Sequence, residues 1–275
     1  MTDTIEAEQV NSNTSIKQFQ LGRIIRRTFS AIKHNIKPLL LAIILIWAFR
    51  FLVSLIFLLP LSLAGDNQNI AAGGIILISV ISIISALFFL MLISAFADIL
   101  AYSKFTNNPV GFKVALKRAA KASLPLLLIC AIYFIAMQIG SLLLIIPGII
   151  IALGWAVIGP VYLHEDTPLF GTFGRAWQLS SGYKLWIWLA KIVMSLIFLA
   201  ILMIPIILYI STQSSIGGSG GSKAVISFGV ILSQIFFSIS TYGFFILYAS
   251  FTSALYTELV ELKEGSILNR NTVFD

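Results

Sequence analysis

Six long apolar runs constrain the fold of this sequence more than any other feature. A membrane-spanning helix needs about 20 consecutive apolar residues, because the hydrocarbon core of a bilayer is about 30 Å thick. The runs lie at residues 38–64, 70–96, 124–146, 147–163, 185–210 and 224–251. Hydrophobic residues make up 59% of the chain and charged residues 11%, which excludes a soluble domain. We therefore predict an all-α, polytopic membrane protein with six transmembrane helices.

Polar stretches between the runs set most of the span boundaries. Residues 65–69 separate the first two runs, and the Ser/Gly-rich segment 211–222 separates the last two. No polar loop divides the third run from the fourth. We place that break at Pro147-Gly148, because proline suits the first turn of a helix and glycine permits a tight reversal. The fourth span is then short, and we expect Pro160 to kink its last turn.

The chain outside the runs predicts a simple domain layout. Residues 1–16 are polar and lack the apolar core of a cleaved signal peptide, so we expect a disordered N-terminal tail. A membrane domain follows over residues 17–256 and opens with an interfacial helix at 17–37. Residues 257–275 are then a cytoplasmic tail.

Lysine and arginine gather on one side of the predicted six-span path. They cluster in segments 17–37, 104–121 and 175–191, with two more in the tail. Short loops rich in Lys and Arg stay in the cytoplasm, so this asymmetry predicts that both termini are cytoplasmic.

Three amphipathic segments, at 19–36, 112–121 and 169–177, each precede a pair of apolar runs. In the second, Lys113, Lys117 and Lys121 recur every four residues and so share one face of a helix. We expect such helices to lie on the cytoplasmic membrane surface. The pattern indicates either three repeated units, each an interfacial helix followed by a transmembrane hairpin, or the basic connectors that any multispan protein carries.

Arg50 is the cation placed deepest in a predicted span. It lies twelve residues after Pro38, hence about 18 Å along the helix and near the middle of the bilayer. An arginine there costs about 2.5 to 3.5 kcal/mol, which marks it as a candidate contact for a lipid phosphate or a solute. The alternative is an arginine that snorkels to the surface or is capped by backbone carbonyls. Other candidate lipid or solute contacts are Arg27, Lys113, Lys117 and Arg175.

Residues suited to catalysis or metal binding are few. The histidines are His34 and His164, and the one cysteine, Cys130, lies in an apolar run. His164 precedes Glu165 and Asp166, but three consecutive side chains point in different directions, which disfavours joint metal coordination. We expect Asp166 to cap a helix and Glu165 to be an interfacial anchor. The sequence thus predicts no enzyme, no cofactor and no metal site.

The net charge of +7 needs no nucleic acid to explain it. The basic residues flank apolar spans, where anionic lipid headgroups attract them. The expected partners are membrane lipids, including anionic ones, and either further copies of the chain or another membrane protein.

Several motifs resemble one known family. IIPGIIIAL at 145–153, VYLHED at 161–166 and RAWQLSSG at 175–182 are similar to the membrane-domain family of glycerophosphoryl diester phosphodiesterases and its YciC-like bacterial relatives. The opening LGRIIRRTF at 21–29 resembles the first segment of that family.

The resemblance implies a bacterial inner-membrane protein of about six spans. It marks Pro147, Gly148, Glu165, Trp177 and Gly182 as structural positions of the family motif. Phosphodiesterase activity is not carried over, because no soluble catalytic domain follows the last span. The expected function is a noncatalytic role in envelope or membrane-lipid homeostasis or as a membrane scaffold; the alternative is a transporter or channel for a small or amphiphilic solute.

Overall fold

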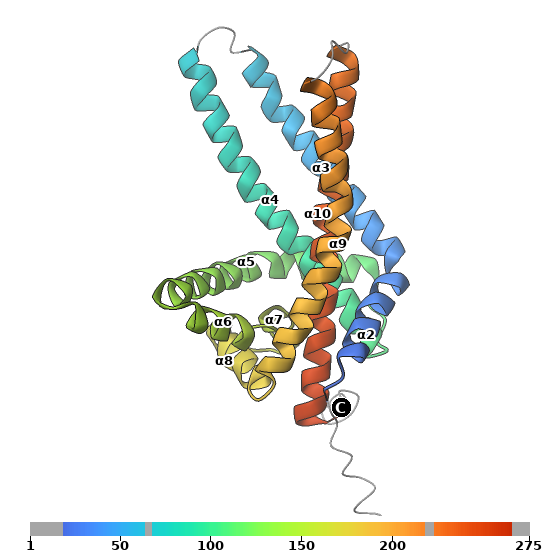
Figure 1. The fold of residues 1–275 in the computed structure, drawn as a ribbon, viewed down its shortest axis with the longest axis vertical. Coiled ribbons are helices and arrows are strands. Elements are labelled where there is room, and N and C mark those ends of the chain that lie inside the picture. The colour runs from blue at the N-terminus through green and yellow to red at the C-terminus, as the bar shows by residue number, and fades with distance from the viewer. Residues whose placement is uncertain (1–18, 64–67, 218–222, 266–275) are drawn as a thin grey trace, which may run out of the picture.

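The computed structural model describes residues 19–63, 68–217 and 223–265, and those residues form helices without any strand (Figure 1). For parts of the long helices, including position 50, the structure describes the backbone but not the side chains.

Four long helices run along the long axis of the molecule (Figure 1). They are α3 (Ile36–Leu63), α4 (Gln68–Phe105), α9 (Lys184–Gly217) and α10 (Lys223–Glu264). Helix α10 is the centre of the arrangement, since it packs against α4, α9 and the short helix α2 (Leu21–His34). The long helices are apolar along almost their whole length, as a lipid environment requires.

Helices α5 (Phe112–Leu143) and α6 (Ile145–Gly154) form a hairpin that runs across the direction of the long helices (Figure 1). A small residue lets the two helices touch: a Cβ added at Gly148 would lie 2.1 Å from Oγ of Ser141. The apolar tip of the hairpin is exposed, with Leu142 89% accessible. In a bilayer this surface faces hydrocarbon.

The remaining short helices gather at one end of the long helices. Helix α2 bends by 68° into α3. Helices α7 (Ile158–His164) and α8 (Leu169–Ser180) follow α6. The ring of Trp177 packs directly on Gly154, since a Cβ added there would lie 2.1 Å from the ring. We call this end, which holds α2, α7, α8 and the last turns of α4 and α10, the polar end.

Both outer limits of the described chain lie at the polar end. Phe19 stacks on Tyr183 and Trp186 at the start of α9, with ring centroids 6.3 and 6.0 Å apart. The backbone N–H of Gln20 donates to Glu258, near the end of α10. The two ends of the described chain are therefore on the same side, as an even number of membrane crossings requires.

The all-α, polytopic membrane fold is confirmed. Within the described residues, five helices are long and apolar enough to cross a membrane, and the bent pair formed by α2 and the first part of α3 is a sixth candidate.

Some predicted boundaries were wrong. The break between the third and fourth spans is at Leu144, whose extended backbone separates α5 from α6. Pro147 does lie in the first turn of α6, where its missing N–H would have no helical partner. Gly148 serves close helix packing rather than the reversal. The fourth span is broken after Gly154, and Pro160 lies in the first turn of α7 instead of kinking a last turn.

Other corrections concern helix length. The predicted surface helix at 112–121 is continuous with the third span, because α5 accommodates Pro125. Helix α10 does not end with the sixth apolar run at 251. It continues to Glu264, so residues 257–264 of the predicted tail are helical, and the turns near Tyr256 are fully buried. Asp166 does not cap α8, whose N-cap position is Pro168.

We predict that Gly148→Ala lowers the stability of the protein by about 1 to 3 kcal/mol, because an added methyl group forces α5 and α6 apart. Gly174→Ala is the control, since nothing lies within 4 Å of a Cβ there. Thermal unfolding in detergent measures both variants. Equal melting temperatures for Gly148→Ala and the unmodified protein would contradict the close α5–α6 contact.

Candidate functional site

Acidic side chains of α10 lie inside the polar end. Thr257 and Glu258 are fully buried, and Glu261 is 21% exposed at its side chain. A buried carboxylate is unfavourable unless hydrogen-bonded or paired with a cation. The fold of this end therefore depends on what faces these carboxylates.

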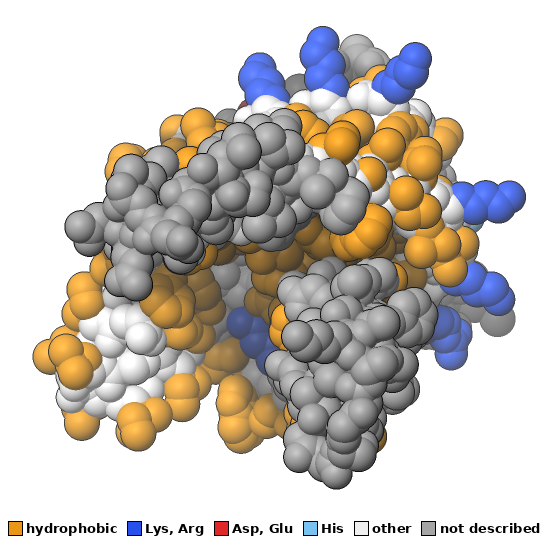
Figure 2. All heavy atoms as spheres, turned by 90° about the horizontal axis from the view of Figure 1, so that it is seen from above, with side chains coloured by type: hydrophobic (Ala, Val, Ile, Leu, Met, Phe, Trp, Pro, Cys, Tyr) orange, Lys and Arg blue, Asp and Glu red, His pale blue; other side chains and the backbone are white. Residues whose placement is uncertain are grey.

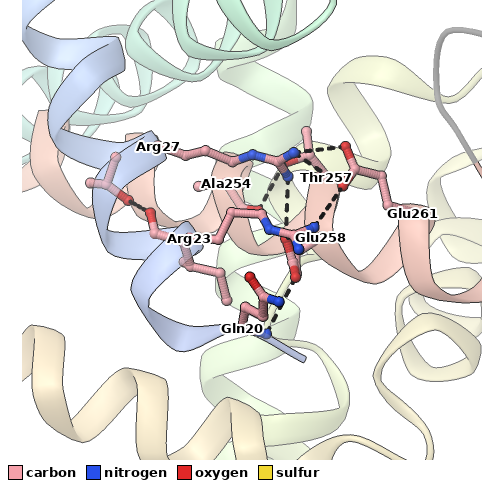
Figure 3. A network of polar contacts seen from close by, with 9 residues as sticks. Gln20, Arg23, Arg27, Ala254, Thr257, Glu258 and Glu261 are labelled. Carbon is pink, nitrogen blue, oxygen red and sulfur yellow. Dashed lines mark hydrogen bonds and ion pairs between the residues drawn. The ribbon is translucent and has the colours of Figure 1, made fainter. Parts of the chain in front are cut away.

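Helix α2 supplies the partners (Figure 3). Nη2 of Arg27 donates to both carboxylate oxygens of Glu261, at 2.9 and 3.0 Å. Its Nη1 donates to Oε2 of Glu258 at 3.3 Å and to Oγ1 of Thr257 at 3.4 Å. One guanidinium thus bridges three polar side chains of α10, Thr257, Glu258 and Glu261, and its fork geometry fits this role.

A second arginine extends the network. Nη1 of Arg23 lies 3.6 Å from Glu258 and 3.7 Å from Glu261. Arg23 and Arg27 are four residues apart and so lie on one face of α2. The backbone N–H of Gln20 donates to Oε1 of Glu258 at 3.3 Å, so both oxygens of the buried carboxylate have partners (Figure 3). We call these residues with Thr257 the α2–α10 clamp.

On another side of α10, Arg175 of α8 makes a second set of ion pairs. Its Nε donates to Glu165 at 2.7 Å and its Nη2 donates to Glu165 and to Glu264. The hydroxyl of Tyr256 donates to the same Glu165 carboxylate at 2.9 Å. The hydrogen bond to Glu165 raises the pKa of Arg175 above its already high ordinary value, so this guanidinium is always charged.

A buried acid and histidine face each other between α4 and α7. Nε2 of His164 lies 2.9 Å from Oδ1 of Asp98, and the two side chains are 6% and 4% exposed. The ring of Tyr102 stacks on His164 with centroids 3.8 Å apart. Hydrogen bonding and stacking together hold the imidazole in one orientation.

The two members of this pair line different cavities. Asp98 lines a central cavity of about 160 Å³ between α4, α5, α7 and α10, with Tyr133 and Tyr248 also in its wall. His164 lines a more polar cavity of about 210 Å³, which also contacts Arg118. The Asp98–His164 pair thus forms part of the wall between an interior cavity and one at the polar end.

A row of basic side chains lies on the outside of α5. Lys113, Lys117 and Lys121 are exposed, and within the described residues no carboxylate pairs with them. Their neighbours Val114 and Leu124 are 55% and 69% exposed. We call these three lysines the lysine row.

The residues proposed from the sequence as lipid or solute contacts are not brought together. Arg27 and Arg175 both reach α10, but in separate ion-pair networks. Lys113 and Lys117 belong to the exposed lysine row. The side chain of Arg50 lies outside the described residues.

The motif residues of the family resemblance lie in or between α6, α7 and α8. Pro147 and Gly148 follow Ile145, the first residue of α6, and Glu165 pairs with Arg175. Trp177 covers Gly154 and accepts Lys184 over its ring at 3.8 Å. Gly182 has a φ of +87°, a conformation that favours glycine.

Sequence reasoning missed the α2–α10 clamp and the Asp98–His164 pair. A signal for the clamp was present: Glu258 and Glu261 are three residues apart and could face Arg23 and Arg27, four residues apart. Ending the sixth helix at residue 251 placed these acids in a tail. The Asp98–His164 pair had no local signal, because 66 residues separate its members.

Within the described residues, no group of three or more His, Cys, Asp or Glu side chains is placed to hold a metal ion. Comparison of the chain with protein families, curated proteins and solved structures found no match.

We predict that Glu258→Leu destabilises the protein by about 3 kcal/mol, since it removes the buried counterion of two arginines. This value is at the lower end of the range for a broken buried ion pair, because both arginines are partly exposed. Glu261→Gln should cost less, because its side chain is partly exposed. Thermal unfolding in detergent measures both.

The double exchange Arg27→Glu with Glu261→Arg tests the pairing itself. It should recover part of the stability lost in Arg27→Glu alone, because it restores opposite charges across α2 and α10. Strictly additive losses would show that the two side chains do not interact.

Proposed function

We propose that the protein is a noncatalytic membrane protein of the bacterial inner membrane that acts in envelope or membrane-lipid homeostasis, with its polar end in the cytoplasm. The observation that carries this proposal is the lysine row. Arg23, Arg27 and Arg175 are neutralised by carboxylates inside the fold, whereas Lys113, Lys117 and Lys121 are left without such partners in the described structure.

Anionic lipid headgroups are the partners that fit the lysine row. A lysine near an anionic membrane surface contributes about 1 kcal/mol, so three in a row give a useful preference. The adjoining exposed apolar side chains of α5, such as Val114 and Leu124, can enter the acyl region while the ammonium groups stay at the headgroups. Figure 2 shows Lys and Arg side chains projecting from the edge of a face on which apolar side chains are exposed.

The cytoplasmic placement of the polar end rests on charge. The lysine row lies on the helix that leaves α4 at this end, and Arg175 and Lys184 also lie there. Loops rich in lysine and arginine remain on the cytoplasmic side. The bacterial inner-membrane part of the proposal rests on the sequence motifs at 145–153, 161–166 and 175–182 and on the family that they resemble.

We expect the triple variant Lys113→Gln, Lys117→Gln, Lys121→Gln to retain about one fifth or less of the anionic lipid that the unmodified protein retains above a zwitterionic background. Native mass spectrometry after release from membranes of mixed composition measures the retained lipid. The matched control replaces the same three lysines with arginine, which keeps the charge. Unchanged lipid retention in the glutamine variant would overturn the proposed role of the row.

A second candidate function, passage of a small solute, is favoured by one specific observation. The Asp98–His164 pair stands between the central cavity and the polar cavity, where it can relay protons or bind a cationic or hydrogen-bonding solute. Buried ionisable groups in a membrane protein commonly mark such pathways.

Liposomes containing the protein and a trapped pH-sensitive dye test this candidate. If protons pass through the Asp98–His164 pair, a potassium diffusion potential should drive a proton flux above that of empty liposomes. Asp98→Asn should abolish this flux. Asp166→Asn is the control, since Asp166 is exposed and has no ion pair in the described structure. Flux equal to that of empty liposomes would contradict a proton passage.

A further inference from the structure

Lys191 is a cation inside a membrane-spanning helix without a counterion. It lies seven residues after Lys184, the first residue of α9, and hence about 10 Å along the helix axis. It is also three residues past Trp188, whose neighbours Tyr183 and Trp186 form an aromatic cluster typical of the membrane interface. With this aromatic cluster at the membrane interface, Lys191 would lie just below the lipid headgroups, where the acyl chains begin.

The ammonium group of Lys191 is held in place but not neutralised. Its Nζ donates to the backbone carbonyl of Ala152, in the last turn of α6, at 3.0 Å. An ammonium group has three donors, and within the described residues no other acceptor and no carboxylate is in reach of it. The carbonyl fixes the direction of the side chain and leaves two N–H donors of the ammonium group for an anion.

An apolar groove begins at this ammonium group. It has a volume of about 180 Å³ and lies between α9 and α10. Its lining includes Lys191, Ser195 and Phe198 of α9 and Phe244, Tyr248 and Phe251 of α10. A closed apolar cavity of about 150 Å³ already holds a benzene molecule, so this groove has room for a stretch of hydrocarbon.

The groove is open to the surroundings of the bundle. Ser195 is exposed, and Tyr248 is 40% accessible. In a bilayer, hydrocarbon chains surround these surfaces, and an acyl chain is the material available to fill an apolar groove there. Figure 2 shows a Lys or Arg side chain at the bottom of a hollow that is partly lined by apolar side chains.

We propose that the α9–α10 groove binds an anionic phospholipid, with one acyl chain along Phe198, Phe244 and Phe251 and with its phosphate on Lys191. Charge complementarity selects this occupant, because the single ionised group at the groove is a cation with no partner acid in the described structure. The site is separate from the lysine row, which lies on α5. It goes beyond a general preference for anionic membranes by assigning one lipid to one groove.

Photo-crosslinking gives a positional test. The full-length protein is placed in nanodiscs with a phosphatidylglycerol that carries a photoactivatable group on its acyl chain, and labelled residues are mapped by mass spectrometry. Parallel samples contain the same group on phosphatidylcholine or on a free fatty acid. We expect labels on Phe198, Phe244, Tyr248 or Phe251, about fivefold more with phosphatidylglycerol than with phosphatidylcholine.

Variants separate lipid binding from folding. Lys191→Met should reduce the phosphatidylglycerol labels in the groove about fivefold, and Lys191→Arg should keep them. Because Lys191 also bonds to Ala152, a second variant leaves that bond intact: Ser195→Phe fills the open side of the groove and should displace the labels. Melting temperatures of all variants identify any that fail to fold.

The outcomes distinguish this site from the lysine row. The glutamine variant of Lys113, Lys117 and Lys121 should lose general lipid enrichment but keep the groove labels, so failure of one proposal leaves the other standing. Equal labelling by phosphatidylcholine, stronger labelling by the fatty acid, or unchanged labelling in a folded Lys191→Met or Ser195→Phe variant would each overturn the anionic phospholipid site.

Discussion

The buried carboxylate of Glu258 is the constraint on which the polar end depends. A charge with no access to water requires hydrogen bonds and counterions, and these come from Arg23, Arg27 and the N–H of Gln20, some 230 residues away in sequence. Satisfying Glu258 therefore ties the first described helix to the last. The same requirement holds the chain at the 68° bend between α2 and α3, because α2 must lie along α10 while α3 continues into the bilayer.

The electrostatics of the protein divide into charges that organise the fold and charges that remain for other molecules. The ion pairs of Arg27 and Arg175 join α2 and α8 to α10 within the fold. Because they are partly buried, they are more specific than pairs on the surface. The lysine row and Lys191 have no such partners in the described structure. Anionic lipid is the partner proposed for both, for the lysine row at the surface of α5 and for Lys191 in a groove beside α9.

Small side chains decide how the helices approach one another. Gly148 admits Ser141 across the α5–α6 hairpin, and Gly154 admits the ring of Trp177. Both contacts rely on the missing Cβ, and in a lipid solvent such close packing contributes much of the attraction between helices. The hairpin in turn brings the carbonyl of Ala152 to Lys191, so the packing of small residues also positions the groove.

The apolar runs by themselves determined an all-α membrane fold, since a backbone in hydrocarbon must satisfy its hydrogen bonds within each helix. They could not give the crossing direction of α5 and α6, the length of α10 or the partners of Asp98, because those depend on side chains far apart in the sequence. The sequence suggested Arg27 and Arg175 as lipid or solute contacts, and only the tertiary structure shows them paired with acids of α10. Lys191 reads in the sequence as a loop-flanking residue; it becomes a candidate site because α9, α10 and the end of α6 meet around it.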